Sequence, residues 1–369
     1  MAVAANALEP SVPDGFGVNI HFTDPRPGEM KMLADAGFKW VRMDFHWGGT
    51  EREKGKYDFR AHDRLMTALD EHGIRALFIL DYGNRLYDNG LAPCTDEGRV
   101  AFARWAAAAV EHFKDRGVLW EMWNEPNIKF WKPAPNVTNY IALARATGKA
   151  IRAVAPREQY SGPATSLIDM KFLEACFQGG TLEYWDAVTV HPYRQKAPET
   201  VLAEYAKLRT LIDKYAPKGK RIPIISGEWG YSCAWKNFND DRQGKYLPRQ
   251  FLVNLMAGVP LSIWYDWRDD GTDPKEPEHH FGVVRHLLRE TKPAYPALQA
   301  LVANLRGYRF DKRVETASPD DFVLLFRKNW QTKYAVWTTN AAPHEATVCD
   351  QRLTLTDTPQ YITPKEKTR

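Results

Sequence analysis

Short apolar segments alternate with longer amphipathic segments about eight times along most of the chain. The apolar segments have the length and composition of strands, which we expect at 16–22, 40–47, 75–83, 119–125, 159–166, 187–193, 222–231 and 261–267. Several of the amphipathic segments have helical periodicity and end at a glycine, namely Gly37, Gly73, Gly117 and Gly258. Eight such repeats with nothing left over predict an α/β fold, a closed (β/α)8 TIM barrel, rather than an open doubly wound sheet.

The pattern changes after the segment 292–307. Residues 321–340 alternate between apolar and polar and are rich in β-branched and aromatic side chains, with a hairpin turn expected at 328–333. We therefore divide the chain into a disordered leader or signal-peptide remnant at 1–12, a catalytic barrel at 13–307 and a small β-rich module at 308–369. The module carries no constellation of reactive residues, so we interpret it as a structural appendage, with a glycan-binding accessory role as the alternative.

Composition excludes several classes of protein. The net charge is only +4 and no long basic run is present, so no nucleic-acid partner is predicted. No apolar run reaches about 18 residues, so no membrane insertion is predicted. The four cysteines lack a C-x-x-C or zinc-like spacing. The small residues "AVAANA" have the composition of the tail of a removed signal peptide, which favours a secreted or periplasmic protein; the sequence predicts no oligomeric state.

The chain is rich in aromatic residues, with 13 Trp, 16 Tyr and 17 Phe. About half of them suffice for a large core. The others suggest aromatic platforms in a wet cleft, because sugar rings have apolar faces that stack on aromatic rings while their hydroxyls form hydrogen bonds at the rim. Trp131, Trp235 and Trp267 lie in or near expected loops and are candidates for such platforms.

Polar and aromatic residues gather at the carboxyl ends of the expected strands, where the active sites of such barrels lie. The candidates there are His21, Arg42, Asp44, Asp81, Asn124, Glu125, His191, Tyr193, Glu228, Trp264 and Asp266. Glu125 and Glu228 follow strands on opposite sides of the barrel mouth. Two facing carboxylates can hydrolyse a glycosidic bond, with retention at a separation of about 5–5.5 Å and inversion at about 6.5–9.5 Å. Arg42 is expected to keep Glu228 ionised.

The sequences "WNEPN" (123–127) and "ISGEWGYS" (225–232) together resemble clan A of the glycoside hydrolases, over roughly residues 16–307. Arg42 in "WVRMDF" matches the arginine of the clan's second strand. His191 and Tyr193 in "VTVHPY" match the pair on its sixth strand, and Trp264 matches the tryptophan of its eighth strand. Within the clan the chain is most similar to family 39, and next to family 5.

The resemblance implies that Glu125 is the acid/base, that Glu228 is the nucleophile and that the configuration is retained. It further implies that Asn124 binds the sugar 2-hydroxyl and that Tyr193 donates a hydrogen bond to the nucleophile. Pro126 is expected to end the fourth strand so that Glu125 lies at the rim. Asp266 begins the long loop 266–280, which is expected to shape the cleft; its spacing does not fit an EF-hand, and no metal or cofactor is predicted.

We therefore predict a retaining glycoside hydrolase that cleaves β-glycosidic bonds in a polysaccharide or glycoconjugate, endo-acting, by a two-glutamate double displacement. The nearest alternative is an exo-acting β-glycosidase of the xylosidase, glucosidase or galactosidase type, which a pocket closed by the loop 128–136 would favour. A non-hydrolytic glycan-binding barrel is the alternative of another class. An aldolase or metal-dependent lyase is disfavoured, because no strand ends in a lysine or in a His/Asp metal cluster.

Overall fold

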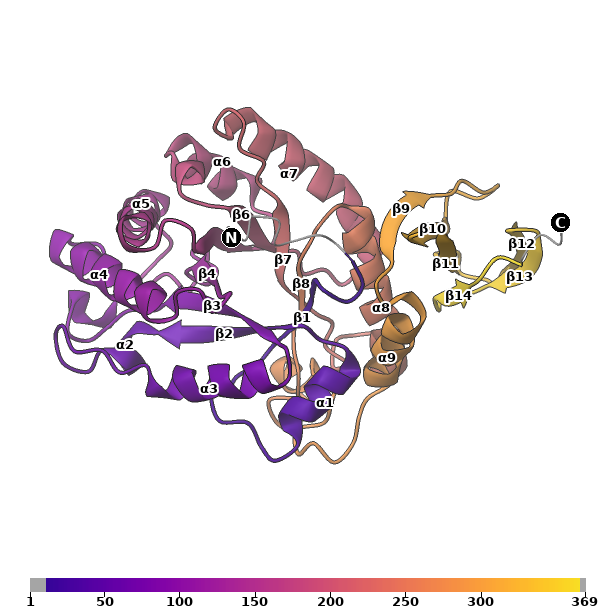
Figure 1. The fold of residues 1–369 in the computed structure, drawn as a ribbon, viewed down its shortest axis with the longest axis horizontal. Helices are drawn as coiled ribbons and strands as arrows, with labels where there is room; N and C mark the ends of the chain where they lie inside the picture. Colours follow the sequence, from indigo (N-terminus) through magenta and orange to yellow (C-terminus); the bar gives the residue numbers. More distant parts are fainter. Residues whose placement is uncertain (1–10, 366–369) are drawn as a thin grey trace.

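The computed structural model describes residues 11–365, and in this range eight parallel strands form a closed barrel in the order β1 to β8 (Figure 1). The strands are β1 (Phe16–Asn19), β2 (Trp40–His46), β3 (Arg75–Asp81), β4 (Leu119–Met122), β5 (Gln159–Ser166), β6 (Ala187–His191), β7 (Ile224–Trp229) and β8 (Ser262–Trp264). The predicted TIM barrel is confirmed. Most of the predicted leader lies outside the described residues; within it, Val12 is buried and its N–H donates to the carbonyl of Tyr308.

Helices cover the outside of the barrel and connect its strands (Figure 1). They are α1 (Glu29–Ala36), α2 (Trp47–Thr50), α3 (Arg60–Glu71), α4 (Asp96–His112), α5 (Val137–Val154), α6 (Met170–Gln178), α7 (Leu202–Tyr215), α8 (Asp240–Met256) and α9 (Ala294–Leu305). Short 3-10 turns are η1 (Asp88–Gly90), η2 (Thr181–Glu183), η3 (Pro198–Val201) and η4 (Pro277–His280). The main apolar core lies between the strands and these helices.

The barrel interior is apolar at one level and polar at the next. A buried apolar cluster fills one level and consists of Trp40, Leu77, Ile79, Leu119, Ala187, Ile225, Leu261 and Ile263. Side chains of a strand alternate between its two faces, so a residue two positions further on points the same way. Arg42 and Glu121 follow Trp40 and Leu119 at that interval, and both are buried. The strands therefore carry the polar side chains in a layer nearer their carboxyl ends.

Strand β4 ends three residues before Glu125, which corrects the expectation that Pro126 ends it at the rim. Trp123 and Glu125 have φ angles of 67° and 47°, in the left-handed region that interrupts a strand. The N–H of Glu125 donates to the carbonyl of Ala164, beyond the last register pair of β4 and β5. The backbone therefore turns at Trp123, and this turn, rather than the proline, places the Glu125 side chain.

The C-terminal residues form two antiparallel sheets (Figure 1). One has the order β14-β11-β10-β9 and the other pairs β12 with β13; the strands are β9 (Arg309–Arg313), β10 (Asp321–Lys328), β11 (Gln331–Thr338), β12 (His344–Val348), β13 (Gln351–Leu355) and β14 (Gln360–Ile362). The predicted hairpin is confirmed, since Lys328 pairs with Gln331 across its turn. The division between residues 307 and 308 stays a prediction.

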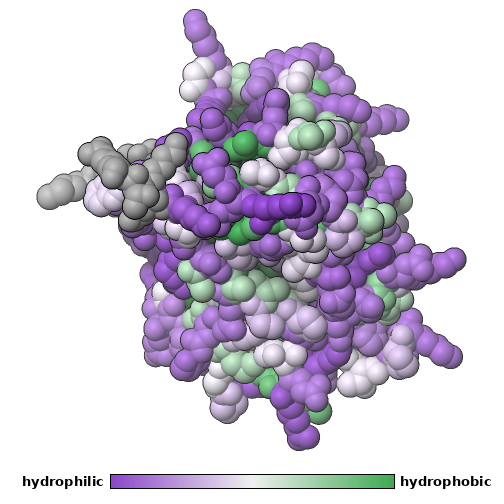
Figure 2. All heavy atoms as spheres, turned by 90° about the vertical axis from the view of Figure 1, so that its right-hand side faces the viewer, coloured by the Kyte–Doolittle hydropathy of each residue, from purple (hydrophilic) through white to green (hydrophobic). Residues whose placement is uncertain are grey.

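A buried polar contact joins the C-terminal sheets to the barrel. The Trp337 indole N–H donates to Glu199 at 2.7 Å, and the Arg249 guanidinium of α8 binds both oxygens of Glu199, each at 2.7 Å. The face of the molecule on the side of these sheets is mostly hydrophilic, with small separate hydrophobic areas (Figure 2). Among the described residues, no helix combines the length and the hydropathy that crossing a membrane requires.

Candidate active site

Arg42 of β2 is the centre of a buried hydrogen-bond network. Its side chain is 1% exposed, and its guanidinium reaches Glu121 at 2.8 Å and Glu228 at 2.6 Å. Burial by itself would lower the pKa of Arg42, but Glu121 and Glu228 outweigh it and raise that pKa. The other groups that the guanidinium contacts are Asn19, Asn124 and His191. Arg42 thus keeps a fixed positive charge beside Glu228 and orients the groups around it.

Glu228 of β7 lies at the mouth with both carboxylate oxygens occupied. One oxygen accepts from Arg42, and the other accepts from the Tyr193 hydroxyl at 2.9 Å. The pKa of Tyr193 is raised, by burial first and then by the charge of Glu228, so its hydroxyl stays protonated and donating. A carboxylate that accepts one charged and one neutral hydrogen bond is stabilised in its ionised form. Glu228 is therefore held through both oxygens, by a fixed positive charge on one and a neutral donor on the other.

Glu125 lies in a more apolar environment. It is 7% exposed, and burial raises its pKa to about 7, against the opposing effects of Ser166, Arg42 and Lys129. The Arg42 N–H donates to Nε2 of His191, so Nδ1 of that ring carries the hydrogen and donates to Glu125 at 3.0 Å. The pKa of His191 is lowered to about 4, chiefly by burial, which keeps the ring neutral. This arrangement favours a Glu125 that is protonated near neutral pH.

The two glutamates are close together across the mouth. One carboxylate oxygen of Glu125, one of Glu228 and a nitrogen of His191 all lie within 4.8 Å of one another. Nδ1 of His191 is 3.0 Å from Glu125 and 3.9 Å from Glu228. An oxygen–oxygen separation below 4.8 Å is compatible with the short carboxyl separation of retaining enzymes, about 5–5.5 Å.

Asn124 joins this group from the turn after β4. Its side-chain oxygen accepts from Arg42 at 2.8 Å, and its amide nitrogen donates to the Tyr82 hydroxyl at 2.9 Å. The loop that carries it is held at Asn127, whose amide forms hydrogen bonds with the backbone of Ser166. The structure thus brings six of the predicted residues together: Arg42, Asn124, Glu125, His191, Tyr193 and Glu228.

Three of the four predicted tryptophans are buried away from the mouth. Trp131 is 2% exposed and packs on Trp123 and Tyr140, and the indole N–H of Trp267 donates to Glu29 of α1. Trp264 is fully buried, and its indole N–H faces the carbonyl of Phe281 at 3.4 Å. These side chains are part of the main apolar core and are not exposed platforms.

Trp235 is partly exposed and lies at the outer end of an aromatic row. Its ring packs edge-on against Phe281 at 5.2 Å between centroids, and Phe281 in turn contacts Tyr265 and Tyr193. Tyr193 is the hydroxyl donor to Glu228. The row therefore leads from the surface to Glu228, and the role of Trp235 as a sugar platform stays a prediction.

The remaining predicted polar residues lie in two groups on the β8, β1, β2 and β3 side of the mouth. His21 faces Asp266 and Asp270 of the loop after β8. Asp44 and Asp81 flank His46, whose Nδ1 is 3.1 Å from Asp81 and whose Nε2 is 3.6 Å from Asp44. Hydrogen bonding to Asp81 raises the pKa of His46 to about 9.

The histidines in these clusters are engaged with hydrogen-bond partners and do not offer a lone pair to a metal ion. Asn19 accepts from Arg42 with its oxygen and donates with its nitrogen to Nε2 of His21, so Nδ1 of His21 carries the hydrogen. The same reasoning gives His191 an Nδ1 hydrogen. Hydrogen bonding to Asp81 raises the pKa of His46 and burial raises the pKa of Asp81, so this pair holds a proton between them. The site chemistry is therefore that of carboxylates and hydrogen bonds.

Sequence reasoning missed Glu121, Tyr82 and Asp270. Glu121 is fully buried on β4 and shares Arg42 with Glu228, and its Oε2 has no hydrogen-bond partner among the described residues. A charged residue inside an otherwise apolar buried strand was the available signal, because such a charge needs a partner inside the barrel. Tyr82 lies at the carboxyl end of the expected strand 75–83 but was not selected as a site residue. Asp270 had no comparable signal, since the conformation of its loop decides where it lies.

A closed parallel barrel with two glutamates facing each other at its carboxyl-terminal mouth is the arrangement of a glycoside hydrolase. The model of the cellulase family, glycosyl hydrolase family 5, matches residues 14–270, which is more than half of the chain. The chain therefore belongs to this family of glycoside hydrolases. The predictions of clan A and of an enzyme, a retaining glycoside hydrolase, are confirmed.

Similar solved structures include a family 39 glycoside hydrolase from Bacteroides cellulosilyticus WH2, with a TM-score of 0.83 and 25% identity over 95% of this chain and 81% of that one. A GH39 β-xylosidase from Caulobacter crescentus has the same fold, with a TM-score of 0.69 and 20% identity over 92% of this chain and 81% of that one. A β-xylosidase of Geobacillus stearothermophilus is 37% identical over 112 residues, which are 27% of this chain and only 21% of that relative.

Proposed function

We propose that this protein hydrolyses β-glycosidic bonds by double displacement, with Glu228 as nucleophile and Glu125 as acid and base. The observation that carries the proposal is the position of the two carboxylates, with oxygens within 4.8 Å of each other but in opposite environments. Glu228 accepts from Arg42 and Tyr193, whereas burial raises the pKa of Glu125 to about 7. One glutamate is thus suited to attack and the other to donate a proton.

In the first step, a Glu228 oxygen forms a bond to the anomeric carbon, and the proton of Glu125 passes to the glycosidic oxygen. The bond between that oxygen and the anomeric carbon breaks, and the aglycone leaves as an alcohol. In the second step, the ionised Glu125 takes a proton from water, the water oxygen attacks the anomeric carbon and the bond to Glu228 breaks. Two inversions give a product of retained configuration.

His191 and Asn124 prepare these steps. The Nδ1–H of His191 occupies one oxygen of Glu125, which leaves the other oxygen to carry the proton that is transferred. Asn124 is oriented by Arg42 and Tyr82, so its amide is held rigidly for a hydrogen bond to the sugar 2-hydroxyl. Both groups cost little reorganisation during the reaction, because their hydrogen bonds fix them beforehand.

We propose further that the enzyme acts inside a polysaccharide chain. A cavity of about 550 Å³ opens beside Asp44 and His46, between the segment after β1 and helix α3. Neither glutamate lines it, and we infer that it holds sugars beyond the cleavage point. The loop 128–136 packs against the connection that follows β3. Trp131 is buried, and the carbonyl of Lys132 accepts a hydrogen bond from the N–H of Ala92. Both features favour an open cleft.

An exo-acting β-xylosidase is the second candidate. The observation that favours it is the similarity to the Geobacillus stearothermophilus β-xylosidase, at 37% identity over 112 residues. Exo action needs a mouth that ends at the non-reducing sugar. The two candidates share the glutamate chemistry and differ in the length of product that they release.

The test is hydrolysis of a panel of aryl β-glycosides and β-linked polysaccharides by the wild type and Glu228→Gln, with the product anomers followed by NMR. Retained products that the substitution abolishes support the mechanism, and inverted products contradict it. Release of oligosaccharides from a polysaccharide supports endo action. Release of xylose alone, together with rapid cleavage of aryl xyloside, supports the β-xylosidase instead.

A further inference from the structure

Glu121 of β4 is a fully buried carboxylate that binds the same arginine as the proposed nucleophile. Its Oε1 accepts a hydrogen bond from Nε of Arg42 at 2.8 Å and lies 2.7 Å from Nη2. An oxygen of Glu228 accepts from Nη1 of the same guanidinium at 2.6 Å. One permanent positive charge is therefore shared by two carboxylates, one on β4 and one on β7.

The second oxygen of Glu121, Oε2, has no hydrogen-bond partner among the described residues. It lies against Gly227, the residue before the proposed nucleophile, because a Cβ atom at that position would be only 3.0 Å from it. A glutamine would offer Arg42 the same accepting oxygen without burying a charge. Since a buried charge with an unpaired oxygen is costly, hydrogen bonding to Arg42 does not by itself account for a carboxylate at this position.

Two further groups near Arg42 do not replace Glu121. His191 contacts the guanidinium through Nε2 at 3.2 Å, but burial lowers its pKa to about 4 and keeps the ring neutral. Asp44 helps to raise the pKa of Arg42, but its side chain is 28% exposed. It also lies 3.6 Å from His46, whose pKa is raised to about 9 by hydrogen bonding to a buried carboxyl group. Solvent screening and this neighbour weaken the effect of Asp44.

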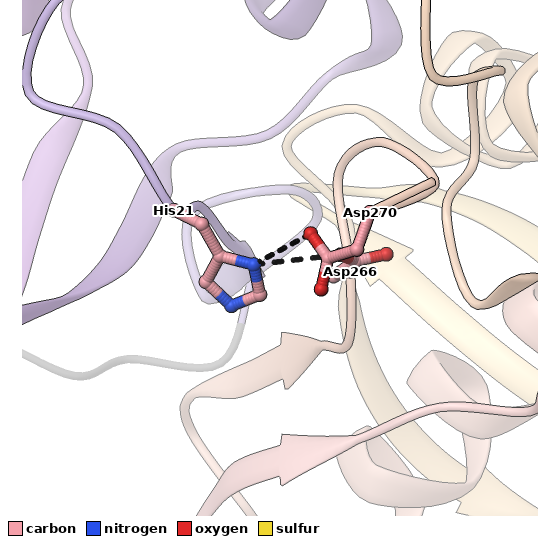
Figure 3. Close-up of side chains that lie close together, drawn as sticks. All are labelled: His21, Asp266 and Asp270. Atoms are coloured by element: carbon pink, nitrogen blue, oxygen red, sulfur yellow. Dashed lines mark hydrogen bonds and ion pairs between the residues drawn. The ribbon is translucent and has the colours of Figure 1, made fainter. Parts of the chain in front are cut away.

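The charged groups on the β1 and β8 side of the mouth are compensated locally. His21 faces Asp270, with its Nδ1 2.8 Å from the carboxylate (Figure 3). Lys292 lies 3.1 Å from Asp269, and burial raises the pKa of Asp266, which favours its neutral form. This side therefore leaves the charge balance at the guanidinium to the groups on β2, β4 and β7.

The proposed first step moves negative charge away from Arg42. Glu228 becomes an ester and loses its charge, while Glu125 gives up its proton and gains one. The ring of His191 joins Glu125 to the guanidinium, bonded to the glutamate through Nδ1 at 3.0 Å and to Arg42 through Nε2 at 3.2 Å. Among the described residues, Glu121 is then the carboxylate that remains in contact with the guanidinium.

We propose that Glu121 is a positioning residue that anchors Arg42 and balances its charge in both steps of the reaction. This inference rests on the proposed function and deepens it. In the free enzyme, Glu121 repels the ionised Glu228 across the guanidinium, so attack on the anomeric carbon relieves a repulsion between carboxylates. In the glycosyl-enzyme, Glu121 keeps Arg42 paired, because a buried cation without a partner is costly. In the second step Glu228 regains its charge beside Glu121, so the repulsion does not assist that step.

The kinetic test separates the two steps with 2,4-dinitrophenyl 2-deoxy-2-fluoro-β-xyloside and the corresponding glucoside, which form a glycosyl-enzyme that breaks down slowly. Intact-protein mass spectrometry follows trapping of the nucleophile in the first step and its recovery in the second. Glu121→Gln keeps the shape and removes the charge, so it should slow trapping at least about tenfold and leave recovery unchanged or faster. Glu121→Asp keeps the charge and should slow trapping by less than about threefold.

Glu199→Gln is the matched control. Glu199 is a buried carboxylate that binds Arg249 and Trp337 where the C-terminal sheets meet the barrel. Its substitution should lower the melting temperature without changing either rate. A purely structural role of Glu121 predicts instead that both steps slow together, because a displaced Arg42 impairs attack and departure alike. Equal slowing of both steps, or unchanged trapping, would overturn the proposal.

Thermal unfolding tests the charge balance without a substrate. Glu228→Gln imitates the uncharged nucleophile of the glycosyl-enzyme. Glu121→Gln should lower the melting temperature by at least about 2 °C more in this background than in the wild type, because Arg42 then loses its last carboxylate contact. Failure of the double variant alone to fold would support the proposal, and equal losses in the two backgrounds would overturn it.

The two measurements separate this inference from the proposed function. If the folded wild type is not trapped by either fluoro sugar and cleaves no glycoside, the proposed function fails, and the unfolding comparison still decides whether Glu121 balances Arg42. Should Glu121→Gln by itself not fold, Glu121→Asp takes its place in both measurements. The longer distance between its charge and the guanidinium should then give smaller effects of the same sign.

Discussion

The two glutamates at the barrel mouth are the same residue type in opposite surroundings. Glu125 is 7% exposed and receives its hydrogen bond from the neutral His191, and its pKa is raised to about 7. Glu228 receives one bond from the permanently charged Arg42 and one from Tyr193. The proposed roles follow from this difference in neighbours, which suits one carboxyl group to donate a proton and the other to attack the anomeric carbon.

The largest effect is expected from removal of the nucleophile. Glu228→Gly should lower kcat by about 10⁴-fold or more, because no other carboxylate can attack the anomeric carbon. Azide should restore activity by entering the space left by the side chain, and a single displacement then gives a glycosyl azide of inverted configuration. The same experiment on Glu125→Gly should give a retained azide. An exchange of these two outcomes, read by NMR, would reverse the assignment of the roles.

Loss of the acid should depend on the leaving group. Glu125→Gln should lower kcat/KM by about 10²- to 10⁴-fold on an unactivated β-glycoside. A dinitrophenyl glycoside needs no proton on its leaving oxygen, so its first step should be nearly unaffected. Steady-state kinetics with both substrates checks this, and circular dichroism confirms that the variant is folded. Equal losses on both substrates would contradict a role in proton donation.

The hydrogen bond that Tyr193 donates to Glu228 can be removed separately. Tyr193→Phe deletes the hydroxyl that donates to Glu228 and should lower kcat by about ten- to a hundredfold, as expected for a hydrogen bond to a charged group. The alkaline limb of the pH profile should stay in place, since Glu125 is not its partner. A shift of that limb would show that the two sides of the mouth are coupled more strongly than the geometry indicates.

Deprotonation of Glu125 should set the alkaline limit of activity. Glu125 must be protonated in the free enzyme, and its pKa is about 7, so kcat/KM should fall about tenfold for each pH unit above that value. The limb should disappear in Glu125→Gln, measured on an activated substrate over pH 5–9. A limb that persists there would have to be assigned to another group.

The smallest kinetic effect is expected for Trp131, which lies in the loop that follows Glu125. Trp131→Phe shortens a buried side chain that packs on Trp123 and Tyr140, so it should lower the free energy of unfolding by about 1–3 kcal/mol. Values of kcat and KM should change by less than about twofold, since the ring does not reach the mouth. Thermal unfolding and kinetics on a polysaccharide measure both effects, and a large rise in KM would instead indicate a sugar platform.

Much of the fold was predictable from the chain because the barrel follows local patterns. All eight strands and the hairpin of β10 and β11 lie where apolar alternation places them. The end of β4 was not predictable, since the left-handed angles at Trp123 and Glu125 depend on contacts with β5. The burial of Trp131, Trp264 and Trp267 was not predictable either, because an aromatic residue in or near a loop can belong to a core or line a cleft.

The sequence by itself determined the barrel, the pair Glu125 and Glu228 and the residues expected around them, because periodicity and short motifs carry that information. The tertiary structure alone decided that Glu121 shares Arg42 with Glu228 and that Asp266 and Asp270 face His21. These contacts join segments far apart in the chain through loops, and a carboxyl group receives its pKa from burial and from the charges that folding brings to it.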